Sequence, residues 1–270
     1  MKHQLTIDRR QLLGKVGFGW TVRVLGFMNV VSLTFCIAFM RPRLPPRKTG
    51  PLVDWAAFKD APYCLQVLGT CFMMPPVYCV FYYVCAPGCI CRAIEVYRKQ
   101  VASYARDELG MPYTESLNLV IIVNGVGLPA RVLPGFIADR FIGVLNVQAI
   151  ALVFNVIMLW TWLSVNSIAG YYVWVVFYGL GAGAFQSLFP SVIGAYSPDI
   201  TKTGTRLGMA FTVIGFSALV GGPISGALLQ VADGNYTVPI SWAASSMMVG
   251  TGLCVSARCI KHGWKVRIRC

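Results

Sequence analysis

The chain has 270 residues, of which 56% are hydrophobic and only 12% are charged, whereas a soluble domain carries about 25% charged residues. This small number of charged residues cannot cover a water-facing surface, which excludes an ordinary soluble domain. The high hydrophobic content excludes a disordered chain. The net charge of +13 is spread among the segments between apolar runs, which argues against a nucleic-acid-binding module. We therefore expect a protein whose main partner is a lipid bilayer.

Seven apolar runs are long enough to cross a bilayer, which takes a helix of about 20 residues. They cover residues 22–40, 63–85, 116–137, 144–163, 170–195, 207–231 and 240–260. Helices are required because open strands would leave backbone groups unpaired in lipid, and none of the runs alternates as barrel strands do. The expected fold class is an all-α polytopic membrane protein with about seven transmembrane helices.

The remaining segments complete the expected organisation. An N-terminal segment, residues 1–21, precedes the first run, residues 41–62 form a linker, and residues 261–270 form a basic tail. The predicted outer loops 164–169 and 232–239 contain no Lys or Arg. By the positive-inside rule, the linker and the tail are therefore expected to be cytoplasmic.

Residues 84–101 look foreign to the helix end that precedes them. Removing residues 85–101 joins Val84 to Ala102 and leaves an uninterrupted FYYVASYARDELG. We interpret the stretch as an insertion and, more specifically, as retained intron sequence. Its three cysteines could bind a soft metal, but no histidine lies near them, so we expect no metal site.

Residues suited to catalysis are scarce. The only histidines, His3 and His262, lie at opposite ends of the chain, no helix carries paired carboxylates, and no nucleophile has a visible base. The sequence therefore predicts neither an enzyme nor a bound cofactor.

Arg131 is a charged residue inside a predicted span, where a guanidinium costs about 2.5–3.5 kcal/mol, so it should face protein or water. Asn124 lies on the same helix face, with small residues between them that leave room for an anion. A guanidinium offers two parallel hydrogen bonds to a carboxylate, so a small organic monocarboxylate is the expected partner. Alternatively, Arg131 snorkels to the lipid phosphates. Gln186, inside another apolar run, is a further candidate substrate-binding residue, or else bonds to a neighbouring helix.

Two further groups of residues are expected to serve motion. Residues 135–143 predict a tight cytoplasmic turn, in which Asp139 and Arg140 are candidate gating residues or, alternatively, a solvated pair. Prolines and glycines inside the spans predict interrupted helices, which are typical of transport sites near mid-membrane, although each proline could simply kink a helix for packing. The expected helix breaks are Pro129, Pro134, Pro190, Gly222 and Pro223.

Several stretches carry a family resemblance. They are GFGWTVRVLGF (17–27), MRPRLPPRKTGPLVDWAAFKDAPY (40–63), NGVGLPARVLPGFIADR (124–140) and YGLGAGAFQSLFPSV (178–192). They resemble fungal members of the monocarboxylate transporter family, and residues 135–143 are similar to the G-x-x-x-D-R-x-x-G loop of the major facilitator superfamily. The likeness covers nearly the whole chain except its start and the insertion.

The resemblance implies a transporter with twelve spans in two halves, which alternates between inward and outward states and carries monocarboxylates, commonly with a proton. Residues 22–40 resemble its sixth span, residues 41–62 its central linker, and residues 63–260 its C-terminal half. The first five helices of the N-terminal half are missing from this pattern, so the missing N-terminal half is an expected partner. The plasma membrane is the implied location. Arg131 matches the family's anion-binding arginine, whereas Gly127 stands where animal members have the aspartate linked to proton coupling.

Two other functions fit the same pattern. Seven spans, an outside N-terminus and the Asp139–Arg140 pair at the inner end of the third span also suggest a seven-helix receptor. A non-transporting remnant of a transporter would have the same fold. The function that the sequence favours is a secondary transporter of monocarboxylates.

Overall fold

The computed structural model describes residues 2–40, 53–85, 113–197 and 199–263. In these ranges every regular element is helical, and seven helices are long and apolar enough to cross a membrane. The expected all-α polytopic fold is thereby confirmed. The chain divides into two compact units, residues 1–52 and residues 53–270.

The first unit contains helix α1 (Lys2–Phe39). Its stretch Val22–Phe39 is the part that is apolar enough to span a membrane, in agreement with the predicted span 22–40. The helix itself begins earlier than that span, because polar residues that cannot enter lipid can still adopt helical geometry.

The second unit begins with a short 3-10 helix, η1 (Trp55–Lys59), and continues with six long helices. These are α2 (Ala61–Cys85), α3 (Tyr113–Ile137) with the π-helical turn η4 (Ala138–Ile142), α4 (Val144–Trp162), α5 (Ile168–Tyr196), α6 (Ile200–Val231) and α7 (Thr237–His262). The six predicted spans of this unit coincide with these helices, since an apolar run in lipid must pair its backbone groups internally. The expected insertion lies outside the described residues except for its first two, which end α2.

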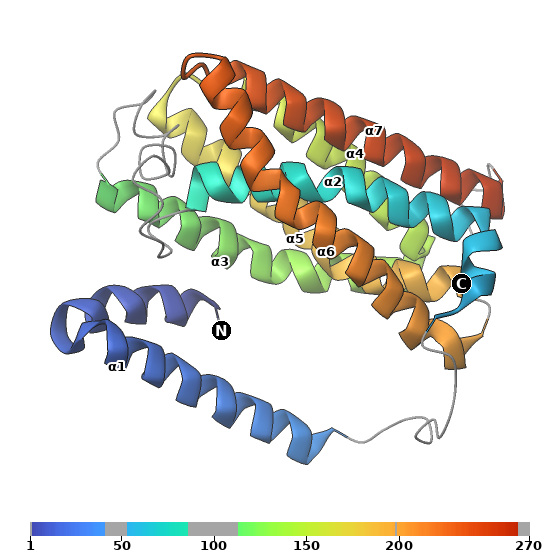
Figure 1. Ribbon diagram of the computed structural model, residues 1–270, viewed down its shortest axis with the longest axis horizontal. Coiled ribbons are helices and arrows are strands. Elements are labelled where there is room, and N and C mark those ends of the chain that lie inside the picture. Colours follow the sequence, from blue (N-terminus) through green and yellow to red (C-terminus); the bar gives the residue numbers. More distant parts are fainter. Residues whose placement is uncertain (1, 41–52, 86–112, 198, 264–270) are drawn as a thin grey trace. The chain divides into compact units, whose positions relative to one another are not determined.

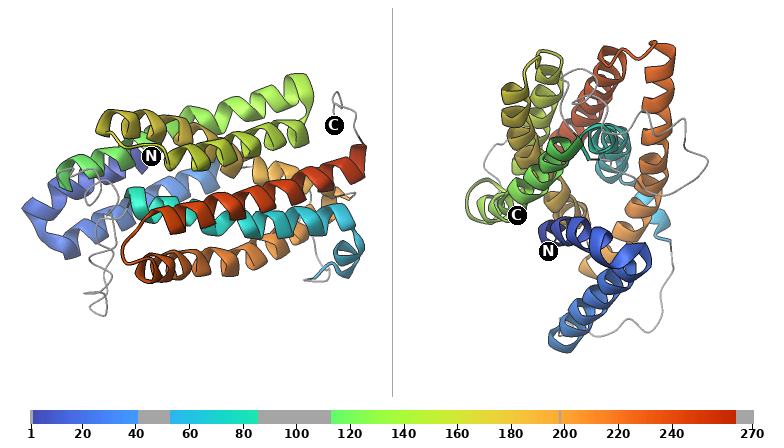
Figure 2. Two further views of the ribbon diagram at one scale, coloured as in Figure 1. Left: turned by 90° about the horizontal axis from the view of Figure 1, so that it is seen from above. Right: turned by 90° about the vertical axis from the view of Figure 1, so that its left-hand side faces the viewer.

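The long helices of the second unit run alongside one another (Figure 1). Helix α2 packs against α6 and α7, α5 packs against α3 and α4, and α4 packs against α7. The views in Figure 2 show the same bundle from above and from one end. Helices α4 and α7 thus join a group around α5 to a group around α2.

Glycines allow close approach at several of these crossings. A Cβ atom added at Gly69 of α2 would lie 2.7 Å from the Gly250 carbonyl oxygen of α7, and one at Gly221 of α6 would lie 2.8 Å from the Cα atom of Pro75. Small residues are the usual means of tight helix packing in a membrane, where lipid tails remove the hydrophobic drive for association. Larger side chains here would force the helices apart.

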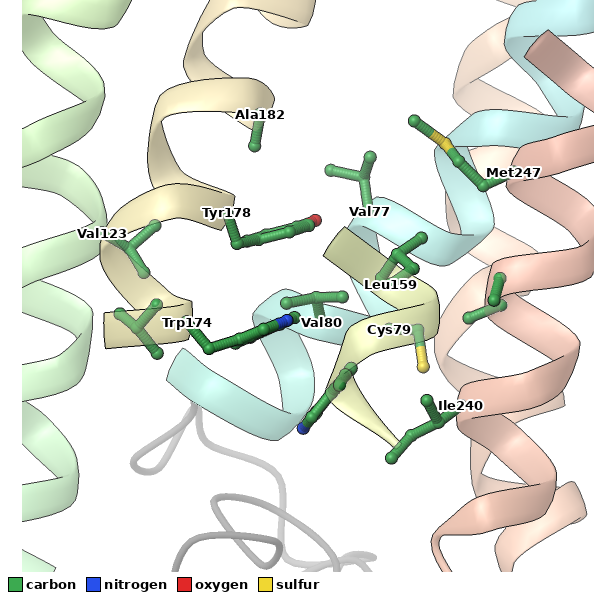
Figure 3. Close-up of a cluster of buried hydrophobic side chains, with 14 of the residues drawn as sticks. Val77, Cys79, Val80, Val123, Leu159, Trp174, Tyr178, Ala182, Ile240 and Met247 are labelled. Carbon is green, nitrogen blue, oxygen red and sulfur yellow. The ribbon is translucent and has the colours of Figure 1, made fainter. Parts of the chain in front are cut away.

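An apolar core fills the space between α2, α4, α5 and α7. Figure 3 shows its side chains, among them Val77, Leu159, Tyr178 and Met247. Within this core the Trp174 ring stacks on Trp162 at a centroid distance of 4.7 Å and on Tyr178 at 5.1 Å. The Trp174 indole also donates to the Met158 carbonyl oxygen at 2.6 Å. The contacts of Trp174 with Trp162 and Met158 therefore hold α4 and α5 together.

Candidate functional site

The predicted substrate-binding residues lie on α3 and α5, which cross closely. A Cβ atom added at Gly183 would lie 2.9 Å from the Gly127 carbonyl oxygen, and one at Gly179 would lie 3.2 Å from that of Val123. A larger residue at Gly183 would require one of the two backbones to shift, and one at Gly179 would be tightly packed, so the glycines permit this close separation. Side chains about one turn beyond the crossing are then brought within reach of each other.

The crossing of α3 and α5 brings the side chains of Arg131 and Gln186 together. Arg131 lies one turn after Gly127, Gln186 lies about one turn after Gly183, and both side chains are half-buried. The Arg131 Nη2 atom donates to Gln186 Oε1 at 3.3 Å. The structure therefore joins two of the three predicted site residues, through a bond between neighbouring helices.

Asn124 also lies half-buried on α3. It precedes Arg131 by two helical turns, which corresponds to about 10 Å along the helix axis. The two residues therefore lie on one side of α3 but at different depths in the bundle.

The charge of Arg131 is not balanced by an acidic side chain among the described residues, where the recorded ion pairs belong to Arg206. Its partner Gln186 is neutral and can orient the guanidinium without neutralising it. A cation within a membrane-capable helix is costly unless it is paired or solvated. The guanidinium of Arg131 thus keeps its capacity to bind an anion.

The expected helix breaks are absent, which corrects the sequence prediction. Helix α3 continues through Pro129 and Pro134, α5 continues through Pro190, and α6 continues through Gly222 and Pro223. Proline has a helix-compatible φ and removes a single backbone donor, a loss that neighbouring helices can offset in a membrane bundle. The described backbone of these three helices is therefore not interrupted at the predicted positions.

The predicted turn at residues 135–143 is also shorter than expected. Helix α3 and η4 carry helical structure through most of it, and the chain leaves the helix only at Gly143, whose φ of 81° suits glycine. Asp139 and Arg140 lie on η4 and are exposed. Within the described ranges neither has a recorded hydrogen bond or ion pair, so their gating role stays a prediction.

Arg206 forms a buried charged cluster that sequence patterns did not reveal. Arg206 is 4% exposed. Its Nε atom donates to Asp54 Oδ2 at 3.0 Å, and its Nη1 atom donates to Asp60 Oδ2, also at 3.0 Å. The Nη1 atom also donates to the Tyr196 carbonyl oxygen at 3.3 Å, and the guanidinium lies 5.4 Å from the Tyr63 ring centroid. The hydrogen bond from Arg206 lowers the pKa of the Asp54 carboxyl below its ordinary value.

This cluster was missed because Arg206 precedes the predicted span 207–231 and reads as an ordinary cytoplasmic loop cation. In the structure, α6 begins earlier, at Ile200, so Arg206 lies inside the helix. The available signal was the pair of aspartates, Asp54 and Asp60, that flank an aromatic stretch of the linker.

No protein-family model matches this chain. An MFS-type transporter of Gibberella zeae is 37% identical over 251 residues, which cover 92% of this chain and 53% of that protein. An MFS-type transporter of Emericella nidulans is 30% identical over 91% of this chain and 52% of its own. An aspyridones efflux protein of Emericella nidulans is 28% identical over 93% of this chain and 47% of its own.

The chain thus spans about half the length of the curated relatives it matches. The matched regions cover nearly all of this chain, whose structure supplies seven membrane-capable helices. The chain is thus similar, over nearly its whole length, to about half of each of two fungal MFS-type transporters, and its seven membrane-capable helices support a multi-pass membrane protein.

Proposed function

We propose that the chain contributes one span and a six-helix half to a secondary transporter of small organic anions. The relatives described above are named as two MFS-type transporters and an aspyridones efflux protein, which favours transport over the receptor alternative. Transport by rocking of two halves around a central site requires a second half. In this proposal the expected N-terminal helices supply the other wall of the cavity.

The environment of Arg131 is the main support for an anionic substrate. This residue is half-buried in the membrane-capable stretch Ile121–Ile142 and has the neutral Gln186 as its recorded partner. A substrate carboxylate would supply the missing negative charge through two parallel hydrogen bonds. Gln186 would keep the guanidinium in place, and Asn124 would offer an amide to a second polar group of the substrate.

The proposed substrates are monocarboxylates, because one guanidinium matches one carboxylate. Any proton coupling would use an acid other than the residue at position 127, which is the glycine of the α3–α5 crossing. Asp139 and Arg140, exposed on η4, would contact the other half in one of the two transport states. Export across the plasma membrane is the proposed direction, since one relative is named as an efflux protein.

The test is saturable binding of radiolabelled short-chain monocarboxylates to the purified full chain in lipid nanodiscs. Arg131→Gln should abolish this binding. Arg23→Gln is the matched control, since Arg23 is an exposed cation in the membrane-capable stretch of α1, and it should leave binding unchanged. Saturable binding that is equal in the unmodified chain and in Arg131→Gln would contradict the proposal.

A further inference from the structure

The short helix η1 presents its side chains in separate rows. A 3-10 helix has three residues per turn, so positions i and i+3 lie above each other. One row contains Asp54, Ala57 and Asp60; Asp54 is 7% exposed and Ala57 is 0% exposed. The next row contains Trp55 and Phe58, which are 76% and 57% exposed. We call Trp55 and Phe58 the aromatic edge of η1.

The inward row holds η1 in a fixed orientation. Arg206 binds the carboxylates on both flanks of the helix, and the Asp54 backbone N–H donates to Met209 Sδ at 3.3 Å. With these groups facing inward, the aromatic edge must face away from the bundle. Its two rings lie 5.8 Å apart and form one continuous apolar surface.

The aromatic edge directly precedes a helix that is long and apolar enough to enter a membrane. One residue separates η1 from α2, whose stretch Ala61–Val80 is membrane-capable. Tryptophan is enriched at the membrane–water boundary, where its amphipathic ring contacts both phases. Lys59, exposed in the third row of η1, can direct its ammonium group to lipid phosphates from the same place.

We propose that the aromatic edge of η1 inserts into the headgroup–acyl boundary of the lipid bilayer, and that the ion pairs of Arg206 hold it in this orientation. Lipid is the occupant because the edge is continuous with the start of a membrane-capable helix and combines aromatic rings with a neighbouring cation. The end of the linker is thereby anchored to the bundle on one side and to the bilayer on the other.

The experiment uses the full chain, labelled with fluorotryptophan and reconstituted in nanodiscs. The Trp55 fluorine signal is assigned by its disappearance in Trp55→Phe. Lipids with a nitroxide near the headgroup end of the acyl chain should erase this signal, whereas a water-soluble gadolinium chelate should leave most of it. Trp174, which is 4% exposed and is assigned by Trp174→Phe, serves as the buried reference and should keep its signal with both agents.

Two results would overturn the lipid contact. Loss of the Trp55 signal with the chelate and not with the nitroxide would place the ring in water. Retention with both agents would mean that another protein segment covers the ring. The second half of the proposal is tested with Arg206→Met and with the milder Asp60→Asn. A variant is used if it keeps the Trp174 signal, and it should then show weaker nitroxide broadening at Trp55. Unchanged broadening in both variants would show that the ion pairs do not hold the aromatic edge in its orientation.

Discussion

Arg131 and Arg206 both lie inside membrane-capable helices, and they differ in how their charge is balanced. Arg206 is 4% exposed and is bonded to two carboxylates and a backbone carbonyl. Arg131 is half-buried and bonds to one neutral amide. A buried cation that is paired with carboxylates is already neutralised, whereas a cation without a counter-ion can still be stabilised by binding an anion. The comparison indicates a structural role for Arg206 and is the basis of the ligand-binding role proposed for Arg131.

The largest expected effect is on stability, and it would separate the two arginines directly. Arg206→Met should lower the free energy of unfolding by about 3 kcal/mol, the lower end for breaking a buried pair, because Asp60 remains partly exposed. Arg131→Met, the matched variant, should cost less than about 1 kcal/mol, since it leaves no buried carboxylate unpaired. Denaturant unfolding in mixed micelles measures both, and equal losses would invalidate the comparison.

The next effect concerns the crossing that places Arg131. Gly183→Ala should lower the free energy of unfolding by about 1–3 kcal/mol, because the new methyl group meets the backbone of α3. Gly208→Ala is the control, since nothing lies within 4 Å of a Cβ atom there, and it should be neutral or stabilising by up to about 1 kcal/mol. Thermal unfolding of the two variants compares them, and an unaffected Gly183→Ala would mean that the glycines do not set the helix separation.

A third variant would make the Arg131 site resemble the Arg206 site. Gln186→Glu places a carboxylate beside the guanidinium, so monocarboxylate binding should weaken by at least about tenfold, or about 1.4 kcal/mol. Gln186→Met removes the amide without adding charge and should weaken binding less. Radioligand competition measures both affinities. Unchanged binding by Gln186→Glu would show that the anion does not use this guanidinium.

The smallest effect is the acid sensitivity of the Arg206 cluster. Arg206 holds the pKa of Asp54 below its ordinary value of 3.8, chiefly by a hydrogen bond. The folded state therefore favours the ionised carboxylate, and the resulting stability is present above the unfolded pKa and lost as pH falls through the folded one. The unfolding temperature should fall between pH 5 and about pH 3, with a shallower fall in Asp54→Asn. Parallel curves for the two proteins would contradict this.

The positions of the spans could be predicted because a helix that crosses lipid needs a long apolar run, which hydropathy detects directly. The continuity of α3 through Pro129 and Pro134 could not be predicted in the same way. A local rule treats proline as a helix breaker, whereas a surrounding bundle can compensate for the lost hydrogen bond.

The candidate site was partly predictable. Arg131 stands out as a charge in an apolar run, but its contact with Gln186 depends on glycines of two separate helices, Gly127 and Gly183. The partners of Arg206 lie far away in sequence, and helical periodicity does not pair such distant residues. Contacts set by tertiary packing therefore account for what the sequence left open.

The cluster of Arg206 also has a consequence for biosynthesis. Chains emerge from the ribosome with the N-terminal residues first, so Asp54 and Asp60 are made long before the cation that pairs with them. Their carboxylates must stay hydrated until α6 has been translated. Assembly of the bundle is then coupled to the arrival of α6, its fifth long helix. The ion pairs of Arg206 join the early segment before α2 to this late helix.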